Sequence, residues 1–174
     1  MKIRKAKISD IEQIVQVHIA CWKTTYKGII PDEFLENLSA DKSIKNWKNF
    51  YSNSPNNILL VAENENSQII GFCSGGLNRD KEKTARFHGE LMAIYILEDY
   101  QKQGIGKKLV KALVQALREK NINNMVAWVL EENNSKIFYE KIGCEFVAKK
   151  TLEIGGKELT VIAYGIDNLD DLRI

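Results

Sequence analysis

The stretch QKQGIGKKLV places Gly104 and Gly106 where an apolar strand pattern ends and a helical pattern begins. The first amides of a helix have no intrahelical partner, so they form a binding site for anions. Glycine removes the Cβ that would block a close approach. Lys102, Lys107 and Lys108 are unfavourable at a helix start unless a polyanion offsets their charge. The turn is therefore a candidate phosphate site, and a plain helix entry with solvated lysines is the alternative.

Two well-known nucleotide loops do not fit this turn. The dinucleotide fingerprint G-x-G-x-x-G fails because position 109 is leucine, and the same Leu109 breaks the Walker A spacing after Gly104. The expected phosphate ligand is therefore not a dinucleotide or ATP held in those ways.

A carboxylate precedes the glycine turn in the run HGELMAIYIL. Strand alternation predicts that Glu90 shares one face with His88, Met92, Ile94 and Ile96. A carboxylate on such an apolar face has a raised pKa, which suits a general base. His88 is the alternative base, and a structural Glu90 satisfied by a neighbouring lysine or backbone donor is the alternative interpretation.

The elements that position these residues follow from periodicity and turn signals. The predicted strands cover residues 2–8, 57–64, 68–76, 88–97, 124–130, 144–154 and 158–166. The predicted helices run from Ser9 to about residue 22, from Ile105 to Leu117 and from Asn134 to Gly143. Residues 28–50 are predicted to form two further short helices, broken near Ser39. This order predicts an α+β fold with a mixed sheet. The helix predicted from Ile105 to Leu117 is a crossover connection, so the strands ending near Leu97 and Leu130 should be parallel.

Length and composition restrict the class of protein. The 174 residues fit one domain, 1–174, and a net charge of +2 disfavours nucleic acid and membrane partners. Three widely spaced cysteines without C-x-x-C disfavour a disulfide framework or a zinc site. The N-terminal stretch has no apolar run typical of a signal peptide, so a cytoplasmic location is expected.

The motifs then resemble those of one enzyme superfamily. Gln101–Gly106 matches the Q/R-x-x-G-x-G/A motif of the GNAT superfamily of N-acetyltransferases, and the run NNSKIFYEKIG resembles its N…FYEK-x-G segment. CWKTTYKGIIPDEFL is similar to the opening helices of many bacterial members, so the resemblance covers nearly the whole chain. One departure is Cys144, where many members have phenylalanine, and Phe146 is expected to take that packing role.

The resemblance implies a GNAT-like fold, with a mostly antiparallel sheet of about seven strands and helices on both faces. It also implies acetyl-CoA as the cofactor, with no metal. The implied pyrophosphate loop consists of Gln101, Lys102, Gln103, Gly104, Ile105, Gly106 and Lys107. The implied contacts to the rest of CoA are Ile94, Tyr95 and Ile96 for the pantetheine arm, Asn133 (or Asn134) near the cofactor, and Lys136 at a phosphate.

The resemblance also assigns chemical roles. Glu90 lies fourteen residues before Gly104, the spacing at which some relatives carry a catalytic glutamate. Tyr139 corresponds to a tyrosine that donates a proton to the leaving thiolate, and Trp22 and Tyr26 correspond to residues that line the acceptor site.

The implied reaction is direct attack on acetyl-CoA by a primary amine of a small molecule, such as a polyamine or amino acid, in a ternary complex. A protein or peptide N-acetyltransferase and a non-catalytic acetyl-CoA-binding module are the alternatives. An exposed edge of the C-terminal hairpin could pair two copies into a homodimer.

Overall fold

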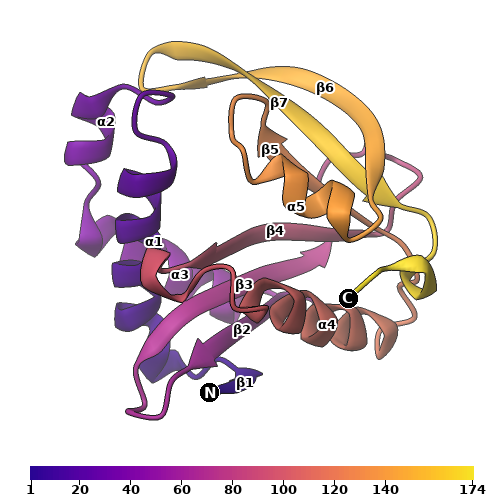
Figure 1. Cartoon of the computed structure of the whole chain (residues 1–174), viewed down its shortest axis with the longest axis horizontal. Helices are drawn as coiled ribbons and strands as arrows, with labels where there is room; N and C mark the ends of the chain where they lie inside the picture. The colour runs from indigo at the N-terminus through magenta and orange to yellow at the C-terminus, as the bar shows by residue number, and fades with distance from the viewer.

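A single mixed sheet of seven strands organises the chain in the computed structural model, which describes residues 1–174 (Figure 1). The strands are β1 (Lys2–Lys5), β2 (Ile58–Glu63), β3 (Ile69–Leu77), β4 (Gly89–Ile96), β5 (Met125–Leu130), β6 (Glu145–Ile154) and β7 (Lys157–Ile166). The helices are α1 (Ile11–Thr25), α2 (Asp32–Glu36), α3 (Ala40–Asn53), α4 (Ile105–Arg118) and α5 (Lys136–Lys141). The strand order is β1-β2-β3-β4-β5-β7-β6, which confirms the predicted mixed sheet.

The pairing of the strands is antiparallel everywhere except between β4 and β5. The crossover through α4 makes those two strands parallel, as the sequence predicts. The predicted hairpin turn at Gly155 and Gly156 is also confirmed, because both residues have positive φ and join β6 to β7.

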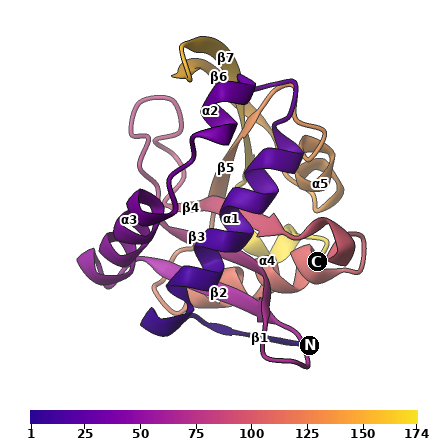
Figure 2. The ribbon, with the colours of Figure 1, turned by 90° about the vertical axis from the view of Figure 1, so that its left-hand side faces the viewer.

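Helices cover both faces of the sheet. Helices α1 and α3 pack against each other and α1 packs on β3 and β4, in the view of Figure 2. Helix α4 packs on the opposite face, where its apolar stripe of Ile105, Leu109, Leu113 and Leu117 is fully buried. None of these helices combines the length and the apolar character needed to cross a membrane.

A β-bulge in β4 changes which residues share a face. Ser74 of β3 pairs with Ala93 and Gly75 pairs with Leu91, so Met92 is the extra residue. Leu91 packs in the core under α4, whereas Ala93 packs on the α1 side. The strict alternation predicted for this strand is therefore wrong.

The bulge moves Glu90 relative to the later part of its strand. Ile94 and Ile96 pack toward α4, whereas Tyr95 packs toward α1. Glu90 alternates with Leu91, so it lies on the α1 side with Tyr95 and not with Ile94 and Ile96. A single inserted residue thus separates the carboxylate from the apolar face on which it was expected.

Close packing at the bulge depends on Gly75. A Cβ at this position would lie 2.6 Å from the carbonyl oxygen of Glu90 and 2.7 Å from Cδ1 of Leu113. The first contact is backbone and the second is a fully buried side chain, so neither can move freely.

We expect Gly75→Ala to lower the free energy of unfolding by about 1–3 kcal/mol, because overpacking a close-packed site forces backbone shifts. Urea denaturation followed by circular dichroism measures the change. A stability equal to that of the unchanged protein would contradict this account of the β3–β4 contact.

Candidate active site

The strands β4 and β5 are paired over only three positions. The pairs are Gly89 with Met125, Glu90 with Val126 and Leu91 with Ala127. Beyond Leu91 the edge of β4 that faces β5 has no partner strand, as Figure 1 shows. Backbone groups along this stretch are therefore available to a ligand.

The starts of two helices meet beside this edge. A Cβ on Gly106 would lie 3.3 Å from Cε2 of Phe138 in α5 and 3.6 Å from Cδ1 of Ile96 in β4. Glycine at position 106 therefore allows the first turn of α4 to approach α5 closely. The glycine turn therefore lies beside both the end of β4 and α5.

The glycine turn leaves its backbone donors free. Lys102 and Gly104 adopt left-handed conformations, with φ of 60° and 79°. The backbone N–H groups of residues 102–107 donate to no other group of the protein. A Cβ on Gly104 would meet nothing within 4 Å, so open space lies beside these donors. This is the arrangement of an anion site at a helix N-terminus.

Polar side chains around the turn hold its framework. Gln101 Nε2 donates to the Ile96 carbonyl at 2.9 Å, and Gln103 Nε2 donates to the Asp99 carbonyl at 3.0 Å. Lys107 Nζ reaches the Arg173 carbonyl at 2.8 Å. These bonds join the turn to β4 and to the C-terminal segment.

The two residues expected at the start of α5 occupy different environments. Lys136 is half-buried, and its Nζ donates to the Glu131 carbonyl at 2.7 Å. Asn133 is buried, and its Oδ1 accepts from the Ser135 amide at 2.9 Å. Asn133 therefore shapes the turn between β5 and α5.

Aromatic residues of α1 meet β4 on the other side of the sheet. The hydroxyls of Tyr26 and Tyr95 are 3.0 Å apart and share a hydrogen bond. Burial raises the pKa of both phenols, and Asn133 lies close enough to Tyr26 to oppose that shift. The Trp22 ring lies 5.0 Å from the Tyr26 ring. The structure thus brings Trp22 and Tyr26, one helical turn apart, together with the distant Tyr95 and Asn133.

Tyr139 is buried in the core beside this group. Burial raises the pKa of its phenol above the ordinary value, so the hydroxyl stays protonated at neutral pH. No group of the protein forms a hydrogen bond with that hydroxyl, which leaves its proton available to a ligand.

Glu90 forms an ion pair that the sequence did not reveal. Its buried carboxylate accepts from the Arg79 backbone N–H at 2.9 Å, from Arg79 Nε at 3.0 Å and from the terminal guanidinium nitrogen at 2.6 Å. His88 Nδ1 instead lies 3.2 Å from Asn124 Oδ1. Arg79 precedes Glu90 across an irregular loop, so no periodicity could have paired them.

That loop, residues 78–88, is held in place by its own polar groups. The Asn78 amide donates to the carbonyls of Thr84 and Phe87, at 2.8 and 3.0 Å. Asp80 accepts from Lys150 Nζ of β6 at 2.6 Å. The loop is thereby joined to β6 through Asp80 and to β4 through the Arg79–Glu90 pair.

Comparison with known proteins identifies the family. A model described as the acetyltransferase (GNAT) family matches residues 16–144, which is most of the chain. The chain belongs to the GNAT family. It is therefore an N-acetyltransferase, and the predicted superfamily and fold are confirmed.

The relatives of this GNAT chain cover most of its length. It is 36% identical over 171 residues to the uncharacterised N-acetyltransferase YuaI of Bacillus subtilis, covering 98% of this chain and 95% of the relative. It is 29% identical over 147 residues to a spermidine N(1)-acetyltransferase of Thermoplasma acidophilum, covering 82% and 87%. The solved PaiA N-acetyltransferase of Thermoplasma acidophilum, in complex with coenzyme A, superimposes with a TM-score of 0.68 at 26% identity, covering 92% and 96%.

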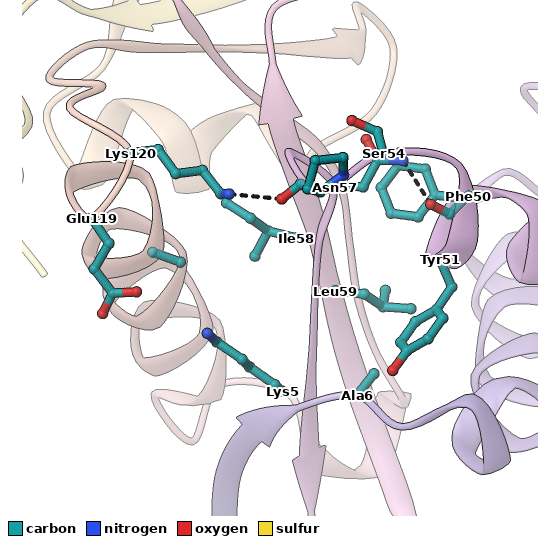
Figure 3. A pocket seen from close by; sticks show the side chains of 12 residues that line it. Lys5, Ala6, Phe50, Tyr51, Ser54, Asn57, Ile58, Leu59, Glu119 and Lys120 are labelled. Carbon is teal, nitrogen blue, oxygen red and sulfur yellow. Dashed lines mark hydrogen bonds between the residues drawn. The ribbon is translucent and has the colours of Figure 1, made fainter.

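A separate hollow of this GNAT chain lies away from the glycine turn. It has a volume of about 490 Å³ and is lined by β1, β2, the end of α3 and the end of α4 (Figure 3). Tyr51 and Lys120 border it, and none of the predicted site residues does.

The Asp80–Lys150 pair predicts a pH-dependent stability. The hydrogen bond from Lys150 lowers the pKa of Asp80 to about 2, below its value in an unfolded chain. The contribution of the Asp80–Lys150 pair to the free energy of unfolding is therefore fully present above about pH 4 and is lost as the pH falls through about 2. We expect Asp80→Asn to lower the melting temperature at pH 7, with a difference that shrinks as the pH falls from 4 toward 2.

Thermal denaturation at a series of pH values measures this difference. Glu65→Gln in the exposed β2–β3 turn is the control, because Glu65 forms no ion pair. A difference for Asp80→Asn that stays constant down to pH 2 would contradict the assigned cause.

Proposed function

We propose that the chain transfers an acetyl group from acetyl-CoA to the primary amine of a small molecule. The observation that carries this proposal is the row of unpaired amides at residues 102–107, next to the unpartnered edge of β4. The CoA complex of the PaiA relative supports acetyl-CoA as the donor.

The chain's own groups account for donor binding. Backbone N–H groups of residues 102–107 hold the pyrophosphate, and Gly104 leaves the space that the phosphates need. Lys102 and Lys107 add positive charge. The edge of β4 at Ile94, Tyr95 and Ile96 pairs with the amides of the pantetheine arm, as an added strand would.

Further contacts come from the start of α5. Asn133 borders the same region, and Lys136 binds a CoA phosphate after releasing the Glu131 carbonyl. When bound, acetyl-CoA supplies a thioester whose acetyl carbon the amine attacks.

The proton transfers fall to two residues of the chain. A free amine has a pKa of about 10, so the acceptor must lose a proton before it attacks. Glu90 accepts that proton through water, while Arg79 holds its carboxylate in place. Tyr139 donates its phenolic proton to the leaving thiolate, and its unpartnered hydroxyl is free to do so.

A small acceptor fits the closed side of the molecule. Helix α2 meets the β6–β7 hairpin in Figures 1 and 2: a Cβ on Gly155 would lie 2.8 Å from Cβ of Phe34. Lys157 Nζ also donates to the Ile29 carbonyl at 2.8 Å. These contacts join the hairpin to residues 29–34, which favours a small acceptor over an extended peptide. Trp22 of α1 and Tyr26, the residue that follows α1, then line the acceptor site.

The decisive experiment is a thiol-release screen with acetyl-CoA. Polyamines, amino acids, aminoglycosides and peptides are tested as separate groups, and products are identified by mass spectrometry. Acetylation of a small amine is the expected result. Acetylation of peptides alone would overturn the small-molecule assignment, and no product with any amine would overturn the transfer reaction.

We expect Tyr139→Phe to lower kcat at least about tenfold, because a general acid typically contributes 10²–10⁴-fold. The affinity for acetyl-CoA should stay near normal, because the ring is kept. Steady-state kinetics and calorimetry measure the two quantities. An unchanged kcat would remove Tyr139 as the acid.

We expect Gly104→Val to abolish CoA binding by calorimetry while the chain still folds. The valine side chain would fill the space beside the free amides, and its left-handed backbone costs about 1–2 kcal/mol. Gly156→Val is the matched control, because Gly156 has φ of 78° and open space but lies in the β6–β7 turn. Normal CoA binding by Gly104→Val would refute the phosphate site.

A further inference from the structure

The position of the Tyr139 ring depends on packing alone. Its hydroxyl has no hydrogen-bond partner in the protein, so no polar contact fixes the direction in which the phenol points. Proton donation requires the donor and acceptor atoms to be within hydrogen-bond distance and aligned. Whatever holds the ring therefore controls the proposed acid.

One neighbouring aromatic ring lies parallel to Tyr139. Tyr164 of β7 stacks on it, with ring centroids 6.0 Å apart and an interplanar angle of 11°. Tyr164 is itself buried, and both residues belong to the core between the sheet and α4. Phe138, by contrast, meets the Tyr139 ring edge-on at 73°. Tyr164 is thus the face against which the Tyr139 ring rests.

The Tyr164 ring is in turn anchored to α5. Its hydroxyl donates to Oε1 of Glu140 at 2.6 Å, and Glu140 directly follows Tyr139 in the helix. This carboxylate contact raises the pKa of Tyr164 to about 12, as expected for a phenol that donates to an anion. Two successive residues of α5 therefore contact one side chain of β7, one by stacking and one by a charge-assisted hydrogen bond.

This double contact restrains the short helix. Helix α5 spans only Lys136–Lys141, too short to be rigid by itself. Phe138 of the helix packs beside Gly106 of the glycine turn. Tyr164 stacks on Tyr139 and so attaches the helix to the sheet. The Phe138 contact positions the helix relative to the glycine turn, and the Tyr164 contact positions Tyr139, the proposed acid.

We propose that Tyr164, anchored by Glu140, is a positioning residue that sets the direction in which Tyr139 delivers its proton. The proposal rests on the proposed function. As the amine nitrogen bonds to the acetyl carbon, the C–S bond breaks and its electron pair goes to sulfur. The Tyr139 proton then moves to that thiolate, and the proton lost by the amine leaves through Glu90. Tyr164 and Glu140 touch none of the reacting atoms.

The test measures kcat and the KM for acetyl-CoA in a set of variants, using an amine found in the screen. We expect Tyr164→Leu to lower kcat about tenfold with KM within about twofold, because the stacking face is lost while the donor loop is untouched. Tyr164→Phe keeps the ring and should lose only about two- to threefold. Glu140→Ala should resemble Tyr164→Phe, and Glu140→Gln should restore activity because its amide oxygen still accepts the hydrogen bond.

A double-mutant cycle separates positioning from general destabilisation. In a Tyr139→Phe background the proton donor is absent, so Tyr164→Leu should then cause little further loss of kcat. Melting temperatures of all variants are measured in parallel. Tyr51→Leu is the control for the same chemical change, because Tyr51 is exposed beside the distant hollow in Figure 3.

Each outcome supports or overturns the proposal. A tenfold effect that disappears in the Tyr139→Phe background supports it. Equal losses of kcat in both backgrounds, or an unchanged kcat with a lowered melting temperature, overturn it while leaving the acetyl transfer intact. A wild-type protein that acetylates no amine overturns the proposed function, and this proposal with it.

Discussion

The short parallel pairing of β4 with β5 is the constraint on which the rest of the structure depends. Three paired positions hold the two strands together, and the bulge at Met92 follows directly. The sheet thereby has two parts, β1–β4 and β5–β7. The two parts are joined where Gly89–Leu91 pair with Met125–Ala127, and they separate beyond Leu91. The proposed pantetheine contacts Ile94, Tyr95 and Ile96 lie on the separated stretch of β4, whereas Glu90 lies within the paired stretch, so the pairing limits where a ligand can lie along β4.

The two faces of the sheet carry different groups of residues. The α4 face carries the apolar core, the glycine turn and the Tyr139–Tyr164 stack. The α1 face carries the Tyr26–Tyr95 contact and the Arg79–Glu90 pair. A reaction between a donor on one side and an acceptor on the other therefore has to take place where the pairing of β4 and β5 ends.

Much of this arrangement was predictable because local patterns encode it. The apolar stripe of α4, the glycine turn before it and the hairpin at Gly155 each follow from spacing within a few residues. The bulge at Met92 was not predictable, since every residue from Leu91 to Leu97 is apolar or aromatic and the sequence gives no sign of an extra residue. The pairing of β3 with β4 shows where that residue lies. The same holds for Arg79 with Glu90 and for Tyr164 with Tyr139. Their partners are distant in sequence, and the pairing is set by tertiary packing.

The hydrogen bonds within the glycine turn have a consequence for the kinetics of association. Gln101 and Gln103 hold the turn on the carbonyls of Ile96 and Asp99, and two of its residues adopt left-handed conformations. An anion arriving at the turn meets donors that are already oriented, so little chain entropy is lost on capture. The encounter should therefore be governed by diffusion and charge and not by a slow rearrangement of the loop.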